Sequence, residues 1–179
     1  MKKIFIFLAA MFIATAAVAQ SSTNTLTAEE NFQKGGDAWK VENYKEAAIY
    51  LEKASKQGNV KAQYILGILY KNGQGVEQSM QKCVEWWEKS ASQGFVTAQT
   101  RLGLCYSNGD GVAKDYKKAA YWWQKAADQG DADAQCLLGA CYLEGEGVPK
   151  DLKKAKELLH KAADQGQENA IKVLKDLGM

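Results

Sequence analysis

The stretch that decides the fold is Gly94–Gln129, GFVTAQTRLGLCYSNGDGVAKDYKKAAYWWQKAADQ, in a chain of 179 residues. The same pattern of residue types begins 36 residues earlier, at Gly58, and 36 residues later, at Gly130. Gly166 marks the same phase once more. A fixed period of about 20–50 residues is typical of stacked supersecondary units. The sequence therefore predicts a solenoid.

Each unit is predicted to contain two amphipathic helices joined by a glycine-rich loop. In the central unit, Leu102-Gly103 and Tyr106 lie on the first helix, Gly109–Val112 ends it, and Asp115 begins the second. Glycine adopts the left-handed conformation cheaply, and Asp is a favoured N-cap residue. Gly103 is predicted to let the second helix approach closely.

The chain outside the central unit divides at the same landmarks. We expect a variant hairpin, three full repeats and a C-terminal capping helix, at 27–57, 58–93, 94–129, 130–165 and 166–179. Thr27 and Glu30 form a capping-box pattern at the start of the hairpin, and Val41–Asn43 forms its turn. In the capping helix, Lys172, Lys175 and Asp176 are expected to face water. We predict an all-α, right-handed α/α solenoid of about nine antiparallel helices.

Residues 1–19 have the features of a secretory signal. Two lysines precede the apolar run Ile4–Ile13, and Ala17–Ala19 forms a small-x-small cleavage site. As a membrane anchor, the uncharged run would fall short of the roughly 20 residues that span a bilayer. We expect cleavage after Ala19, a disordered leader at 20–26, and an exported protein, periplasmic or secreted, without a membrane segment.

Composition argues against several classes of function. Loss of the signal removes two of the 23 basic residues, leaving 21 against 21 acidic residues. A nucleic-acid-binding domain has a strongly basic surface instead. Arg101 and His160 are the only residues of their types. We find no metal-ligand cluster, phosphate-binding loop or nucleophile–base pair in the sequence, and expect no cofactor, metal or nucleic-acid partner.

The repeated residues carry a resemblance to a known family. They read Ala-x3-Leu-Gly-x2-Tyr-x2-Gly-x-Gly-Val-x2-Asp-x3-Ala-x2-Trp-x3-Ala-Ala-x2-Gly. This pattern resembles the Sel-1-like repeat, a relative of the tetratricopeptide repeat, over 58–179, and the preceding hairpin is more tetratricopeptide-like. The resemblance implies an α-solenoid scaffold that holds a protein or peptide partner. An exported member suggests a bacterial periplasmic or secreted protein, which we expect to be a monomer.

Resemblance to tetratricopeptide repeats assigns the concave face to set positions on the first helices. The expected partner-binding groove comprises Phe32, Trp39, Lys61, Tyr64, Ile68, Lys71, Asn72, Thr97, Thr100, Leu104, Ser107, Asn108, Asp133, Cys136, Ala140, Leu143 and Glu144. This groove would be basic toward its N-terminal half and acidic toward its C-terminal half. A partner of opposite polarity would align by charge complementarity.

One motif suggests an enzyme instead. Ser79 to Lys82 spell S-x-x-K, the acylation motif of penicillin-recognising enzymes, and one exported, cysteine-rich branch of the family carries a β-lactamase label. The repeat supplies another interpretation, because Asp115 and Asp151 stand where Ser79 does and are N-caps. The paired cysteines of that branch correspond here to Ala127 and Gln135, which weakens the case for it.

Cysteine and tryptophan each allow two interpretations. Cys83 and Cys105 each lie 11 residues from Gly94, level across an antiparallel hairpin, so they are the best candidates for a disulfide in an exported chain. Otherwise they are small buried hydrophobes. The pairs at 86–87 and 122–123 would suit carbohydrate stacking, but their core-type positions favour packing. We predict a non-enzymatic, exported scaffold that binds a protein or peptide on its concave face, with β-lactamase-like activity and cell-wall glycan binding as alternatives.

Overall fold

The computed structural model describes residues 25–178, whose regular structure is entirely helical. The helices are α2 (Ala28–Lys40), α3 (Tyr44–Lys56), α4 (Val60–Asn72), α5 (Met80–Ser92), α6 (Val96–Asn108), α7 (Tyr116–Ala127), α8 (Ala132–Glu144), α9 (Leu152–Asp164) and α10 (Glu168–Asp176). In this part of the chain no helix has the length and apolar character needed to cross a membrane. The all-α class and the nine helices of residues 25–178 confirm the prediction. The expected signal, 1–19, lies outside the described residues.

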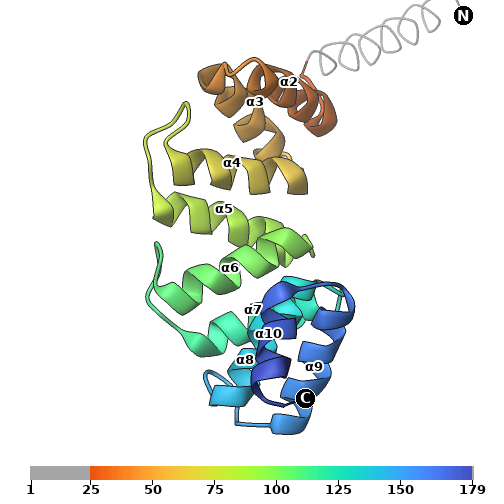
Figure 1. Ribbon diagram of the computed structural model, residues 1–179. Helices are drawn as coiled ribbons and strands as arrows, with labels where there is room; N and C mark the ends of the chain where they lie inside the picture. The colour runs from red at the N-terminus through yellow and green to blue at the C-terminus, as the bar shows by residue number, and fades with distance from the viewer. Residues whose placement is uncertain (1–24, 179) are drawn as a thin grey trace, which may run out of the picture.

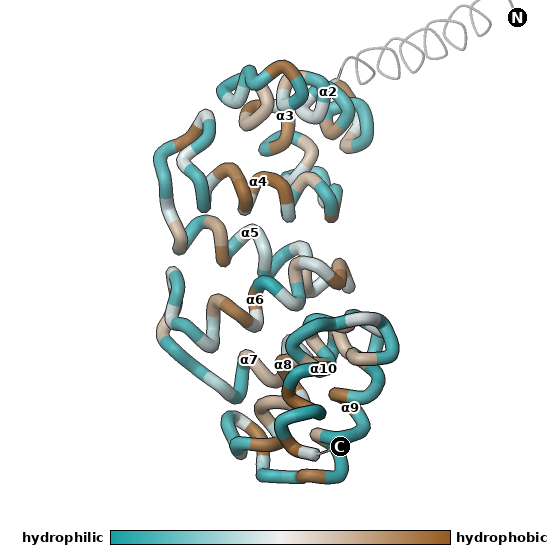
Figure 2. The backbone as a smooth tube through the Cα atoms, viewed as in Figure 1, coloured by the Kyte–Doolittle hydropathy of each residue, from teal (hydrophilic) through white to brown (hydrophobic). Residues whose placement is uncertain are grey.

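The helices pair into hairpins that stack in chain order (Figure 1). We call the first helix of each hairpin the A helix and the second the B helix; the A helices are α2, α4, α6, α8 and α10, and the B helices are α3, α5, α7 and α9. The main contacts join each A helix to its own B helix and each B helix to the next A helix. Apolar and polar segments alternate along α4 and α6 (Figure 2), as expected for helices with one buried face. The fold is an all-α repeat solenoid.

Glycine on the A helix sets how closely the two helices of a repeat approach. A Cβ atom at Gly103 would collide with the indole of Trp123, which is 3% exposed. The indole Nε1–H of Trp123 donates to the backbone carbonyl of Thr100 at 3.3 Å. Gly67 and Trp87 repeat this arrangement one unit earlier. The prediction of close approach at this glycine is therefore confirmed.

The glycine-rich loops join the A helix of each full repeat to its B helix. Gly109 ends α6 in the left-handed conformation, with a φ of 85°. Gly111 has a φ of 72° and lies against the backbone of Met80, the first residue of the preceding B helix. A side chain there would collide with that backbone. Asp115 then caps α7 by accepting a hydrogen bond from the Lys118 N–H at 3.0 Å. The loop therefore ends one helix, begins the next and contacts the previous repeat.

A series of side-chain amides, which sequence analysis missed, links a buried Asn or Gln on α2, α4, α6 and α8 to a Gln at the end of the following B helix. In the central repeat, Gln129 donates to the side chain of Gln99 at 2.8 Å. Gln99 in turn donates to the backbone carbonyl of Ala91, on the preceding B helix, at 3.0 Å. Equivalent side-chain pairs are Asn31–Gln57, Gln63–Gln93 and Gln135–Gln165. These amides tie each repeat internally and to the one before it.

The two ends of the described chain differ from the full repeats. Thr27 and Glu30 form the predicted capping box of α2. Leu26, expected in a disordered leader, has its carbonyl oxygen bound by the side chain of Gln57 at 2.9 Å, so that expectation is wrong at this residue. At the other end, Lys175 of α10 occupies the repeat position of Gly139, the glycine that lets a B helix pack closely against α8. Lys175 is exposed, as are Lys172 and Asp176, as predicted.

Candidate binding face of the A helices

Two hollows lie on the A helices. The N-terminal hollow has a volume of about 260 Å³ and is entirely apolar in its lining. Its residues come from α2, α3 and α4, and they are Gly36, Trp39, Leu51, Ile65 and Ile68. The hollow is open because Gly36 has no side chain and no other group fills the space beside it. It suits an apolar side chain of a partner.

The C-terminal hollow also has a volume of about 260 Å³, but its rim is polar. It lies among α6, α8 and α10, and its lining residues are Thr97, Thr100, Arg101, Leu104, Asp131, Asp133, Cys136, Leu137, Gln167 and Asn169. Leu104, Leu137 and Cys136 supply apolar surface. Arg101 and Asp133 are exposed and bring charges of opposite sign to the rim. This hollow suits an apolar group flanked by charged or hydrogen-bonding groups.

Both hollows use the same positions of the repeat. Ile65 of the N-terminal hollow is equivalent to Arg101 and Leu137 of the C-terminal hollow, since these residues are 36 positions apart. Ile68 is likewise equivalent to Leu104. We call the surface that carries these positions on α2, α4, α6, α8 and α10 the A-helix face. Its residue types change from repeat to repeat, while the packing glycines Gly67, Gly103 and Gly139 stay the same.

The structure brings together part of the predicted groove. Seven predicted residues line the hollows, namely Trp39, Ile68, Thr97, Thr100, Leu104, Asp133 and Cys136. Six others are exposed or half-buried on A helices without lining either hollow, namely Phe32, Lys61, Tyr64, Lys71, Asn72 and Asn108. Ala140, Leu143 and Glu144 are exposed or half-buried on α8.

Three predicted groove residues are largely buried, although Thr100 and Cys136 still line the C-terminal hollow. Thr100 and Cys136 are 7% and 8% exposed, and Ser107 is 9% exposed. The Thr100 hydroxyl donates to the Asp131 carboxylate at 3.0 Å, because α8 begins directly beside it. The Ser107 hydroxyl donates to the Leu104 carbonyl at 3.0 Å. These three side chains therefore offer a partner only a small exposed area.

Sequence analysis missed several other residues that line the two hollows. Arg101, Leu137 and Ile65 occupy one position of the repeat and line the hollows. Gln167 and Asn169 contribute from α10 and its N-cap. The sequence signal that was overlooked is the variation at the repeat position of Ile65. This position holds an isoleucine, an arginine and a leucine in the three full repeats. The resemblance to tetratricopeptide repeats assigned the groove instead to the residue one position earlier in each repeat.

Charge changes along the A-helix face. Lys61 and Lys71 are exposed on α4, and Asp133 and Glu144 are exposed on α8. Asp133 accepts a hydrogen bond from the Gln167 side chain at 3.3 Å, which links α8 to α10 at the surface. A basic half and an acidic half are thus present on these helices, with Arg101 between them. This pattern favours a partner whose charges run the opposite way.

The four cysteines are buried thiols, and none is bridged in the structure. Burial raises the pKa of Cys83 to about 12, with the neighbouring Cys105 adding to the rise. Burial likewise raises the pKa of Cys105 and of Cys141 to about 11. Burial, and then the Asp133 carboxylate, raise the pKa of Cys136. Because the thiolate is the reactive form, all four are poor nucleophiles at neutral pH.

The S-x-x-K motif has a structural role. The Ser79 hydroxyl accepts a hydrogen bond from the Lys82 backbone N–H at 3.3 Å, so Ser79 is the N-cap of α5. The Lys82 ammonium lies 5.2 Å from the ring centroid of Tyr70. Lys118 and Lys154 make the same contact with their own tyrosines in the next two repeats. The N-cap at the start of the B helix and the lysine–tyrosine cation–π contact are thus structural features that recur in each full repeat.

Comparison with known proteins places the repeats in a family. A family model described as the Sel1 repeat matches residues 31–59, 60–95, 96–131 and 132–167. The matches include the first hairpin, where the sequence suggested a tetratricopeptide-like unit. No curated protein matches the sequence.

Solved structures show the same fold at related sequence. The chain is similar to c5321 of uropathogenic Escherichia coli, a protective antigen with an SLR fold, at 30% identity and a TM-score of 0.80, over 92% of this chain and 36% of that one. A Sel1 repeat protein from Oxalobacter formigenes gives 36% identity and a TM-score of 0.73, over 83% and 60%. Cysteine rich protein B of Helicobacter pylori gives 31% identity and a TM-score of 0.54, over 69% and 94%.

The chain therefore spans about a third and about three fifths of the first two of these structures. The sequence identity is 30% or more in each of the three cases. The family supplies a protein-interaction repeat fold. From its repeat pattern, its helical stack and these matches, the chain belongs to the Sel1 repeat family.

Proposed function

We propose that this protein is an exported, non-enzymatic scaffold that binds an extended segment of a partner protein along its A-helix face, the concave side of the solenoid. The observation that carries this proposal is the shared position of the two hollows. Each hollow is built by several helices, and both use equivalent positions whose residue types differ between repeats. Positions that vary on a constant framework are available for recognition.

The two hollows differ in the chemistry that they accept. The N-terminal hollow offers Trp39, Ile65 and Ile68, so it suits an aliphatic or aromatic side chain. The C-terminal hollow places Arg101 and Asp133 beside apolar surface, so it suits an apolar residue next to a charged one. A partner segment with acidic residues opposite Lys61 and Lys71 and basic residues opposite Glu144 would match the charges in register.

The helical framework favours this mode of binding. The glycine contacts, the loops and the buried amides hold each A helix against its neighbours. A face that is already ordered loses little conformational entropy when a partner binds. Binding an extended segment would then require ordering of the partner alone.

Binding can be tested with peptides selected from a displayed random library on the immobilised mature protein. Leu104→Ala removes an apolar group from the C-terminal hollow and should weaken the selected peptides about tenfold. The matched control is Tyr121→Ala, which removes a large side chain that is 54% exposed on the B helix α7. Circular dichroism should show both variants folded.

Two results would reject the A-helix face as the binding surface. One is an equal loss of affinity in Leu104→Ala and Tyr121→Ala. The other is unchanged affinity in Leu104→Ala and in a second variant, Arg101→Glu, which reverses an exposed charge at the rim of the C-terminal hollow.

Export rests on residues 1–19 and is tested separately. The full chain expressed in a Gram-negative host should be recovered from the periplasm or the medium with Gln20 as its first residue, measured by mass spectrometry. A chain without residues 1–19 is the control and should stay in the cytoplasm. Recovery of the uncleaved chain in the cytoplasm would contradict export. The similar Escherichia coli protein is a protective antigen, which accords with a location accessible from outside the cell.

A further inference from the structure

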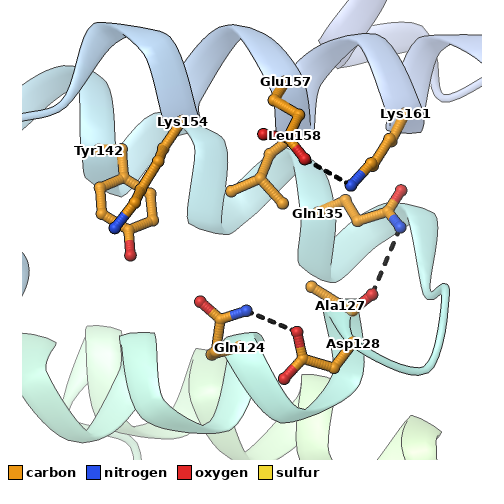
Figure 3. A pocket seen from close by; sticks show the side chains of 9 residues that line it. All are labelled: Gln124, Ala127, Asp128, Gln135, Tyr142, Lys154, Glu157, Leu158 and Lys161. Carbon is orange, nitrogen blue, oxygen red and sulfur yellow. Dashed lines mark hydrogen bonds and ion pairs between the residues drawn. The ribbon is translucent and has the colours of Figure 1, made fainter.

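A third pocket lies away from the A-helix face, between the B helices α7 and α9. Its volume is about 390 Å³. Figure 3 shows Leu158 of α9 pointing toward α7 across the opening, with Gln124 and Asp128 on the opposite side. Tyr142 of α8 lies at one end. The pocket is thus a valley between two B helices, floored by an A helix.

The pocket is open because one residue of the repeat is smaller here. Leu158 stands at the position that Trp122 and Trp86 occupy in the two preceding repeats. Trp86 is half-buried and packs against the apolar core formed by α2, α3 and α4. Trp122 is likewise half-buried and packs against the central core. Leucine lacks the indole and leaves its space free.

One group beside this space, Lys161, is the counterpart of a lysine that contacts an indole two repeats earlier. The Lys89 ammonium lies 4.0 Å from the ring centroid of Trp86. Its counterpart, Lys161, has no ring at the equivalent place and instead pairs with Glu157 at 2.7 Å. This ion pair is exposed and therefore contributes little. Lys161 can release it at small cost and lie over a ring supplied from outside.

The lysine–tyrosine contact at one end of the valley is also the same as in the preceding repeat. The Lys154 ammonium lies 5.3 Å from the ring centroid of Tyr142, and Lys118 lies 5.0 Å from that of Tyr106 in the preceding repeat. The rim is polar, because the Gln124 amide donates to the Asp128 carboxylate at 2.7 Å. A carboxylate and an amide at the rim match the N–H and C=O groups that flank a side chain in a polypeptide.

We propose that this valley binds an aromatic side chain, with tryptophan the best fit, presented by a partner polypeptide. The ring would lie on Leu158 in the place that Trp122 fills in its own repeat, with Lys161 over its face. An indole offers a large apolar area, and its negative ring face attracts the ammonium group. The site is independent of the A-helix face, so one chain could hold two partners.

The probe is a capped peptide, acetyl-Gly-Ser-Trp-Ser-Gly-amide, titrated into the isotope-labelled mature protein and followed by amide chemical shifts. Saturable shifts should centre on Gln124 and Asp128, with a Kd on the order of 1 mM for a single anchoring side chain. The same peptide with leucine in place of tryptophan should bind at least tenfold more weakly. Free indole is the third arm, and it should bind no more tightly than the tryptophan peptide.

Two variants provide the matched comparison. Leu158→Trp places an indole where the sister repeats have one, so it should fold, fill the valley and abolish the saturable shifts. Leu152→Trp adds an indole to the same helix at a side chain that is 50% exposed and outside the valley, and it should leave the Kd within twofold. Circular dichroism and thermal unfolding check that both variants are folded.

The wild-type titrations alone can overturn the proposal, whatever the variants do. Equal binding of the tryptophan and leucine peptides, or no saturation by about 10 mM peptide, rejects an aromatic site. Saturation by free indole alone rejects a polypeptide as its source. Undiminished binding to a folded Leu158→Trp variant places the site elsewhere.

Discussion

Trp123 lies directly over Gly103, and no other residue type at that position would leave room for its indole. The contact joins α6 to α7, and the indole N–H adds a hydrogen bond to the Thr100 carbonyl. The same pairing of glycine and a large B-helix side chain recurs at Gly139, where a Cβ atom would lie 2.9 Å from Leu159 Cγ. The distance between the two helices of each full repeat thus depends on the absence of a side chain at this glycine.

The first prediction concerns that contact. Gly103→Ala should lower the free energy of unfolding by about 1–3 kcal/mol, because displacement of the buried indole outweighs alanine's better helix propensity. Gly36→Ala is the control, since no atom lies within 4 Å of a Cβ there. That variant should gain about 0.5–1 kcal/mol. Urea unfolding measures both, and stabilisation by Gly103→Ala would contradict the packing argument.

A second prediction tests the buried amides. Gln99→Ala removes two hydrogen bonds, to the Ala91 carbonyl and from the Gln129 side chain, and should cost about 1–3 kcal/mol at roughly 0.5–1.5 kcal/mol each. Gln33→Ala removes an exposed amide on α2 and should change stability by less than about 0.5 kcal/mol. Chemical denaturation of the two variants gives the comparison. Equal effects would show that the Gln99 hydrogen bonds add no stability beyond that of an exposed amide.

The repeat made most of the fold predictable. The 36-residue period identified the glycine, loop and cap positions, and each role follows from local backbone chemistry. The buried amides were not predictable in this way, because Gln99 and Gln129 lie 30 residues apart and meet only after the helices pack. A repeated Gln at 63, 99 and 135 was the available signal.

The binding face was predictable only in part. Leu104, Asp133 and Thr100 all line the C-terminal hollow, but Thr100 is only 7% exposed because its hydroxyl bonds to Asp131 at the start of α8. Sequence analysis missed Arg101, the next residue along the helix, whose side chain lies about 100° further around the axis. Which of two adjacent side chains reaches the surface depends on how neighbouring A helices pack, and this is decided only in the tertiary structure.

The third prediction separates a cap from a nucleophile at Ser79. Ser79→Asp should keep or raise stability, because Asp115 and Asp151 cap the equivalent helices and Asp also suits the helix dipole. Ser79→Ala should lose about 0.5–2 kcal/mol. Thermal unfolding ranks the three proteins. In parallel, the wild type should show no turnover of a chromogenic cephalosporin, and Ser79-dependent acylation would contradict the structural role.

The last prediction uses the buried thiols. An unfolded thiol ionises near pH 9, whereas Cys83 in the fold has a pKa of about 12, so between these values the native state holds more protons. Stability is therefore fully present below pH 9 and falls as the pH rises. Cys83→Ala introduces the residue that Ala119 and Ala155 provide in the sister repeats. Wild type should lose about 2 kcal/mol more than this variant between pH 8 and pH 11 in urea unfolding. Parallel slopes would contradict a buried, protonated thiol, and alkylation in denaturant without reductant should modify all four cysteines, since none is bridged.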